Sequence, residues 1–182
     1  MNTWITSDMH LGHFNIIKYC NRPFTNVNDM NNLIIDNWNK VIRDEDTVIN
    51  LGDLGFGFHK LESEDLKKRI CSLKGKVKIL IRGNHDKRRN EEYVAMGFKF
   101  MQKELVMNQI LFTHRPASLR SGIKYNVFGH IHNNDLTSRD YSPEVVITDK
   151  HKVFTLEHHY SPILLEEFIK DDSNLALKRI KK

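Results

Sequence analysis

The chain has 182 residues, a net charge of +5 and 40 % hydrophobic residues, the composition of an ordinary globular protein of about one domain. Its hydrophobic runs are all shorter than the roughly 18 residues that span a bilayer. Its two cysteines are too few for a disulfide framework or a paired-cysteine zinc finger. The first residues form neither a basic nor an apolar leader. We therefore expect one cytoplasmic domain over residues 1–182, with a frayed basic end at 171–182 and no membrane contact.

Short runs with the composition of β-strands recur along the chain, and helical patterns lie between them. We predict strands at Thr3–Ser7, Thr47–Leu51, Val77–Ile81, Gln109–Thr113, Tyr125–Phe128, Val145–Thr148 and Val153–Leu156. Hydrophobic residues between 28 and 42 recur at the spacing of one helix face, and 66–73 and 164–170 show shorter helical patterns. Strands that alternate with helices predict a layered α/β fold.

Polar residues follow five of the predicted strands, directly after the carboxyl end of each. The five segments are Asp8-Met9-His10, Gly52-Asp53, Gly83-Asn84-His85-Asp86, Thr113-His114 and Gly129-His130-Ile131-His132. Taken singly, each segment is typical of a surface turn or of a hydrogen-bonded core histidine. Open α/β sheets bind their ligands at this edge, so five such segments in succession predict one shared site.

The donors in these segments are carboxylate, imidazole and amide oxygen, with no thiolate. Such a set suits Mn²⁺, Fe²⁺ or Zn²⁺ better than Cu⁺, and the histidines argue against Ca²⁺ or Mg²⁺. Seven donors are too many for one tetrahedral ion, and they fit two ions about 3.5–4 Å apart that share a carboxylate. Side chains two residues apart in an extended segment point the same way. We therefore expect Asp8 and His10 to bind one ion together, and His130 and His132 to reach toward adjacent ions.

The order of these motifs resembles that of the calcineurin-like metallophosphoesterase superfamily, in particular its small single-domain bacterial and phage members. The motifs run from Asp8 to His132, and similar flanking segments extend the resemblance over most of the chain. It implies an α/β fold of two packed mixed β-sheets flanked by helices, with a dinuclear metal centre at the strand ends. Thr113 stands where the fourth motif often has glycine, which changes the local loop and removes no donor.

The resemblance also implies a role for each motif residue. Asp8, His10 and His132 would hold one metal, Asn84, His114 and His130 the other, and Asp53 would bridge them. A hydroxide that bridges the two ions would attack the phosphorus in line with the leaving oxygen. We expect His85 to donate a proton to that oxygen and Asp86 to orient the His85 imidazole. The alternative role for His85 is a supporting hydrogen bond.

Residues 67–89 hold ten basic side chains against one acid, so the rest of the chain is net negative. Such a concentration suits a phosphate-bearing partner, and a solvated helix face followed by a loop explains it equally well. Lys87 and Arg88 directly follow the third motif and are expected at the mouth of the site. Further candidates for substrate contact, each with a capping or surface role as the alternative, are His13, Asn15 and Arg115.

The sequence thus predicts a metal-dependent phosphohydrolase that cleaves a phosphodiester or a phosphomonoester, with a nucleotide-like compound as the expected substrate. The ligand set does not distinguish diester from monoester, because both reactions use the same ions. A DNA or RNA nuclease of the same superfamily and a non-catalytic metal-binding scaffold are the alternatives. Neither the oligomeric state nor the physiological metal follows from the sequence.

Overall fold

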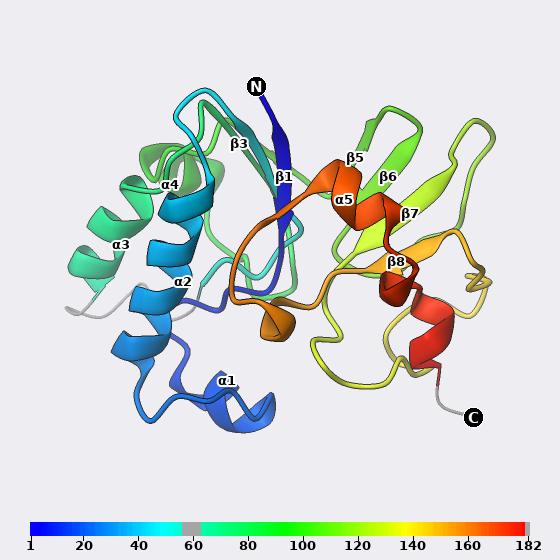
Figure 1. Cartoon of the computed structure of the whole chain (residues 1–182), viewed down its shortest axis with the longest axis horizontal. Coiled ribbons are helices and arrows are strands. Elements are labelled where there is room, and N and C mark those ends of the chain that lie inside the picture. Colours follow the sequence, from blue (N-terminus) through cyan, green and yellow to red (C-terminus); the bar gives the residue numbers. More distant parts are fainter. Residues whose placement is uncertain (56–62, 181–182) are drawn as a thin grey trace.

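The computed structural model describes residues 1–55 and 63–180 and contains two β-sheets that share one hydrophobic core (Figure 1). The first sheet has the order β4-β3-β2-β1-β9, formed by Phe100–Gln102, Val77–Ile81, Thr47–Asn50, Thr3–Thr6 and Ile163–Leu164. Strands β1 to β4 are parallel, and β9 pairs antiparallel with β1. The carboxyl ends of β1, β2 and β3 therefore lie at the same edge of the sheet.

The second sheet has the order β5-β6-β7-β8, formed by Glu104–Met107, Ile110–Thr113, Tyr125–Phe128 and His151–Val153. β5 is antiparallel to β6, whereas β6, β7 and β8 are parallel. Both sheets are thus mixed, and the predicted architecture of two mixed sheets with helices is confirmed. The buried residues of the core come from both sheets, among them Ile5 and Ile49 of the first and Phe112 and Val127 of the second.

The helices of the described residues are α1 (Phe14–Tyr19), α2 (Val27–Val41), α3 (Ser63–Cys71), α4 (Asn90–Ala95) and α5 (Leu165–Lys170). Helices α2, α3 and α4 lie on the outer side of the first sheet (Figure 1). The Asn26 side chain caps α2 by accepting from the backbone N–H of Asp29, and Met30, Ile34 and Trp38 form its buried stripe. Within this part of the chain, the longest helix is too short and too polar to cross a bilayer.

Five of the seven predicted strands are present, with ends that shift by at most one residue. The prediction for Val145–Thr148 is wrong: this segment is a loop in which the Thr148 N–H donates to the His151 side chain. The last predicted strand is displaced, because β8 occupies His151–Val153. Strands β4, β5 and β9 were not predicted, since runs of two to four residues carry too little pattern.

The basic C-terminal end, which we expected to fray, packs beside the second sheet as far as residue 180. Two short 3₁₀ turns at Asp172–Asn174 and Ala176–Arg179 form this segment, and the Ala176 side chain is fully buried. The Arg179 carbonyl accepts from the Leu136 N–H at 2.7 Å. Residues 172–179 thus lie in short turns beside the second sheet.

Candidate metal centre

The five polar segments predicted from the sequence converge at the carboxyl ends of β1, β2, β3, β6 and β7. Four sets of donors in the described residues have atoms within 4.8 Å of one another. Three join residues of the predicted motifs, and they are Asp8 with His10 and His132, His10 with Asp53 and His85, and Asp53 with His114 and His130; the fourth is Cys20 with His132 and Glu157. The Asn84 Oδ1 atom lies 3.2 Å from Nε2 of His114. His10 and Asp53 each belong to two sets, so the donors form one continuous cluster.

The backbone that carries this cluster is strained. Five of the seven predicted ligands have φ angles between 49° and 72°, and they are Asp8, His10, Asp53, His130 and His132. L-residues seldom adopt this left-handed region, at a cost of roughly 1–2 kcal/mol each. Asp8 and His10 do converge, but not from an extended segment as predicted. They converge because the loop turns while their N–H groups donate to the carbonyls of Gly52 and Asp53, both at 2.9 Å.

Two motif glycines are required because backbone approaches the carboxylates closely. A Cβ atom at Gly83 would lie 2.1 Å from Oδ1 of Asp53 and 2.6 Å from its backbone nitrogen. A Cβ atom at Gly129 would lie 2.4 Å from Oδ2 of Asp8, which accepts from the His130 N–H at 2.9 Å. Any side chain at these positions would displace a candidate ligand.

Several acceptor atoms of the cluster face other acceptors. The His114 Nδ1 atom lies 2.9 Å from the Leu51 carbonyl, and its Nε2 atom lies 3.2 Å from the Asn84 amide oxygen and 3.5 Å from Oδ2 of Asp53. With oxygens facing both ring nitrogens, Nε2 needs either a proton or a metal ion between it and these oxygens. Oδ1 of Asp8 and Nε2 of His10 are buried without a hydrogen-bond partner in the described residues. Buried acceptors that converge in this way need a shared cation, so the donor set fits bound metal.

Charge interactions within the cluster favour the anionic form of Asp53. Burial alone would raise the pKa of this carboxyl, but hydrogen bonding and attraction from His114, together with attraction from His10, hold the pKa below its usual range. Burial also opposes the charge on His132, but the carboxylate of Asp8 and hydrogen bonds with Cys20 and Glu157 overcome it and raise the pKa to about 11, so a metal ion that binds His132 would replace a proton. A negative centre surrounded by imidazoles suits a divalent cation.

Comparisons with known proteins agree with this geometry. The sequence matches the calcineurin-like phosphoesterase family over residues 1–177. The chain belongs to this family. An uncharacterized protein of Methanocaldococcus jannaschii is 35 % identical to this phosphoesterase over 173 residues, which are 92 % of this chain and 89 % of that protein. The gene 66 protein of Mycobacterium phage L5 is 28 % identical over 174 residues, 92 % of this chain and 82 % of that protein.

Two solved structures are similar to the phosphoesterase in fold. A protein of unknown function from Aquifex aeolicus has a TM-score of 0.67 at 24 % identity, and the match covers 93 % of this chain and 98 % of that one. Nuclease MPE of Pseudomonas putida has a TM-score of 0.51 at 20 % identity, with 75 % and 64 % covered. At these identities the likeness extends to the fold alone.

Asp86 has a different position from the one expected. Its Oδ2 atom accepts from the N–H groups of Asp53 at 2.7 Å and Gly83 at 2.9 Å, and its Oδ1 atom accepts from Leu54 at 3.1 Å. The carboxylate therefore joins the loops after β2 and β3 instead of orienting the imidazole of His85. These hydrogen bonds to the buried Asp86 carboxylate fix the backbone of Asp53, the residue predicted to bridge the metals.

The predicted substrate contacts divide into two groups. His13 borders the cluster, since its Nδ1 atom lies 3.4 Å from Nδ1 of His10. Asn15 and Lys87, which are two residues from His13 and His85 in the sequence, are exposed. Arg115 donates to the carbonyls of Arg139 and Asp140 at 3.3 and 3.2 Å, and so holds a loop.

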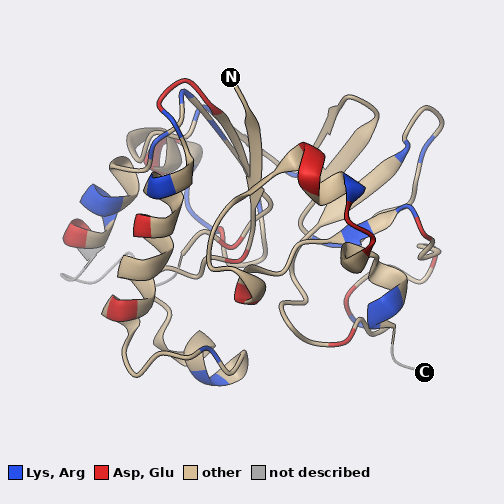
Figure 2. Cartoon of the chain, in the orientation of Figure 1, with Lys and Arg blue, Asp and Glu red and all other residues tan. Residues whose placement is uncertain are grey.

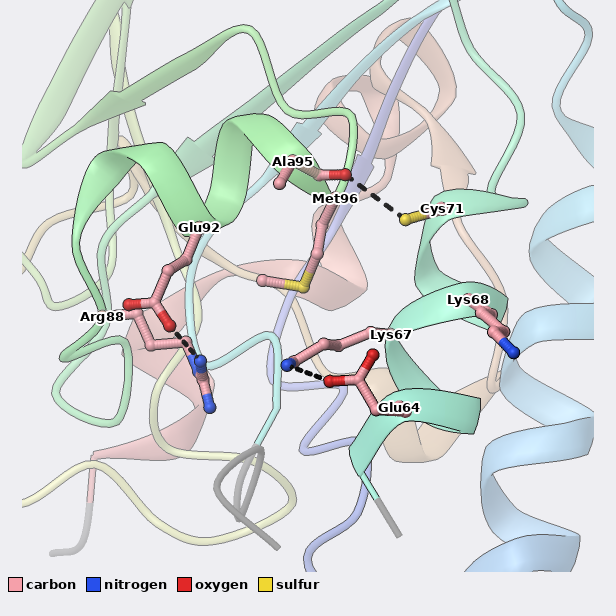
Figure 3. Close-up of a pocket in the computed structure, with 8 residues that line it drawn as sticks. All are labelled: Glu64, Lys67, Lys68, Cys71, Arg88, Glu92, Ala95 and Met96. Atoms are coloured by element: carbon pink, nitrogen blue, oxygen red, sulfur yellow. Dashed lines mark hydrogen bonds and ion pairs between the residues drawn. The ribbon is translucent and has the colours of Figure 1, made fainter. Parts of the chain in front are cut away.

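Arg88, which the sequence placed at the mouth of the site, forms an ion pair with Glu92 of α4. It lines a cavity of about 410 Å³ between α3 and α4 (Figure 3). The residues that line this cavity are Glu64, Lys67, Lys68, Cys71, Arg88, Glu92, Ala95 and Met96, and none of the seven predicted ligands is among them.

Sequence reasoning missed two buried residues behind the cluster, Arg22 and Glu157. Oε1 of Glu157 accepts from Nδ1 of His132 at 2.9 Å and from Nη2 of Arg22 at 2.7 Å. Neither residue belongs to a motif, and 134 residues separate them in the sequence, so no local pattern points to them. Asp140 is a third missed neighbour, with Oδ1 3.7 Å from Nε2 of His130.

Proposed function

We propose that this phosphoesterase hydrolyses a phosphodiester or phosphomonoester of a nucleotide-like compound with two divalent metal ions, of which Mn²⁺, Fe²⁺ or Zn²⁺ fit best. The observation that carries the proposal is the convergence of the predicted donors into one cluster, in which Asp8, His10, Asp53, His114 and His132 are buried, His130 is half-buried and the exposed Asn84 lies 3.2 Å from His114. We assign Asp8, His10 and His132 to a first donor group, Asn84, His114 and His130 to a second, and Asp53 to both.

Two side chains are assigned roles in the reaction: Asp53 supplies negative charge for metal binding, and His85 supplies a proton for the leaving oxygen. A bound pair of divalent ions would lower the pKa of water and neutralise negative charge on phosphoryl oxygens. Asp53 keeps a negative charge between the two donor groups, and the His85 N–H fixes its Oδ1 at 2.8 Å. The His85 side chain is 34 % exposed and its Nε2 lies 4.0 Å from Oδ2 of Asp53. This position at the rim of the cluster suits proton donation to the leaving oxygen.

Aromatic side chains beside the cluster support a nucleotide-like substrate. The rings of His13 and His85 lie 6.0 Å apart, and Tyr19 meets His13 edge-on at 6.3 Å. Tyr19 is 66 % exposed and Phe14, on the same short helix, is 61 % exposed. Exposed rings next to a phosphate site can stack on a planar base.

A substrate panel tests the proposal. The protein is stripped of metal, resupplied with Mn²⁺, Zn²⁺ or Mg²⁺, and assayed on bis-p-nitrophenyl phosphate, p-nitrophenyl phosphate, cyclic nucleotides and single-stranded DNA. We expect metal-dependent release of product from at least one phosphoester, with Mn²⁺ or Zn²⁺ more effective than Mg²⁺. Bound metal without turnover on any substrate would contradict the proposal and favour the non-catalytic scaffold.

A nuclease is the second candidate, because nuclease MPE of Pseudomonas putida has a similar fold. Polynucleotide binding that relies on phosphate contacts weakens steeply as salt rises. The basic stretch offers limited support, since Lys78 and Arg82 donate to backbone carbonyls and Arg88 pairs with Glu92. Steep salt dependence of single-stranded DNA cleavage, with slow turnover of small diesters, would favour the nuclease.

A further inference from the structure

A buried ion pair lies directly behind the candidate metal centre. Nε and Nη2 of Arg22 donate to Oε1 of Glu157 at 3.0 and 2.7 Å, and the two side chains are 0 % and 5 % exposed. Arg22 follows α1, whereas Glu157 lies in the 3₁₀ turn Leu156–His158 near the C-terminus. Burying two charges costs free energy that hydrophobic packing would not. The pair therefore calls for a role beyond general stability.

Glu157 determines which nitrogen of His132 faces the cluster. Its Oε1 atom lies 2.9 Å from Nδ1 of His132, and an ionised carboxylate can only accept, so the ring proton lies on Nδ1. Nε2, which would give up its proton to bind a metal, then faces Oδ1 of Asp8, 3.8 Å away. A carboxylate behind a histidine commonly fixes the ring orientation of a metal ligand in this way.

The same guanidinium also holds the turn that carries the other two donors of the first group. Nη2 of Arg22 donates to the Asp8 carbonyl at 2.8 Å, and Nη1 donates to the Met9 carbonyl at 3.1 Å. Asp8 and His10 flank this point with φ angles of 53° and 49°. Hydrogen bonds to the carbonyls of a strained turn stabilise its conformation. Arg22 therefore holds the turn that carries Asp8 and His10 directly, and it contacts His132 through Glu157.

We propose that Arg22 and Glu157 are positioning residues that set the metal affinity of the first donor group and leave the second unaffected. The contacts divide accordingly. Besides their bonds to each other, the hydrogen bonds of the Arg22 and Glu157 side chains in the described residues go to Asp8, Met9, Met30 and His132 and not to the second group. This inference rests on the proposed function, which requires that two ions bind.

Metal binding to the full chain tests this inference independently of turnover. Mn²⁺ is titrated into metal-free wild type, Glu157→Gln and Arg22→Lys by calorimetry, and paramagnetic resonance reports whether two ions are coupled. We expect wild type to bind two ions, and each variant to lose affinity for one ion by about 10–100-fold while it keeps the other. The coupled signal should disappear at metal concentrations that saturate wild type.

A matched control is Glu104→Gln, which breaks the exposed Arg120–Glu104 pair of 2.6 Å on β5 and should bind both ions as wild type does. Thermal melting of each variant shows whether it is folded, and Arg22→Lys decides the question if Glu157→Gln does not fold. Unchanged affinity for both ions, or an equal loss for both, overturns the positioning role. A wild type that binds fewer than two ions overturns the proposed function and this inference with it.

Discussion

The strand-end cluster and the basic stretch 67–89 both suggest phosphate chemistry in the sequence, but they differ in what their polar groups do. In the cluster, Oδ1 of Asp8 and Nε2 of His10 are buried without hydrogen-bond partners among the described residues, and Nε2 of His114 faces two oxygens. In the stretch, many charges are engaged within the protein. Lys67 pairs with Glu64 at 2.6 Å, and Arg82 donates to the Asp86 carbonyl at 2.7 Å.

The comparison shows that buried polar atoms without hydrogen-bond partners indicate a functional site better than a local concentration of charge does. Helix α3 carries acidic residues in its first turn and basic residues in its last turn (Figure 2), which is the arrangement that stabilises a helix by itself. The cluster, in contrast, combines strained backbone with converging acceptors, a combination that is unfavourable until a cation binds. Changes in the cluster should therefore affect chemistry, and changes in the stretch should not.

The largest effect is expected from Asp53→Ala. Because this carboxylate belongs to both donor groups, its loss should remove bound metal and activity together. The loss should exceed the roughly 10–100-fold that the removal of a ligand's hydrogen-bond partner costs. Metal content by elemental analysis and turnover of bis-p-nitrophenyl phosphate are measured on the same sample, and retained activity would end the assignment of Asp53 as the shared ligand.

His85→Asn should separate binding from catalysis. The side chain lies at the rim of the cluster, so we expect two bound ions and a decrease in turnover of about 10²–10⁴-fold. A leaving group that needs no proton, such as p-nitrophenolate, should show a smaller decrease than an alkyl ester. If both esters are affected equally and metal is lost, His85 is a ligand and not the proton donor.

Gly83→Ala tests whether close backbone approach matters to the centre. The added Cβ would lie 2.1 Å from Oδ1 of Asp53, so either Asp53 or the loop after β3 must shift. We expect weaker metal binding and a decrease of about 1–3 kcal/mol in the free energy of unfolding, measured with urea. Gly122→Ala is a control without a steric clash, because its Cβ would have no neighbour within 4 Å. Its φ of +80°, which Gly83 does not share, adds backbone strain, so the control is if anything the more strained of the two. Equal metal binding by the two variants would contradict the steric argument.

The smallest effect is expected from Arg88→Ala. Arg88 pairs with Glu92 and lines the cavity between α3 and α4, so its loss should leave metal content, KM and kcat unchanged. A pair of this kind contributes at most about 1 kcal/mol to stability. A marked increase in KM for a nucleotide substrate would show that the basic stretch contacts substrate after all, and would break the comparison.

The sequence predicted the strands that carry the cluster because hydrophobic runs and the polar residues after them are local signals. It could not predict the left-handed backbone at Asp8 and His10, because this conformation is uncommon even for Asp and His, which adopt it more often than most residues do. Arg22 and Glu157 stayed hidden for another reason: only the tertiary fold brings together residues so far apart in the chain. Val145–Thr148 was mispredicted because a loop hydrogen bond to His151 outweighed β-type composition.

The most direct test of a two-ion centre is a crystal structure of the protein grown with Mn²⁺ and measured at the manganese absorption edge. The account predicts two anomalous peaks about 3.5–4 Å apart, with a carboxylate oxygen of Asp53 in contact with both. It also predicts Asp8, His10 and His132 around one peak and Asn84, His114 and His130 around the other. A single peak that all seven side chains surround, or manganese bound away from them, would contradict it.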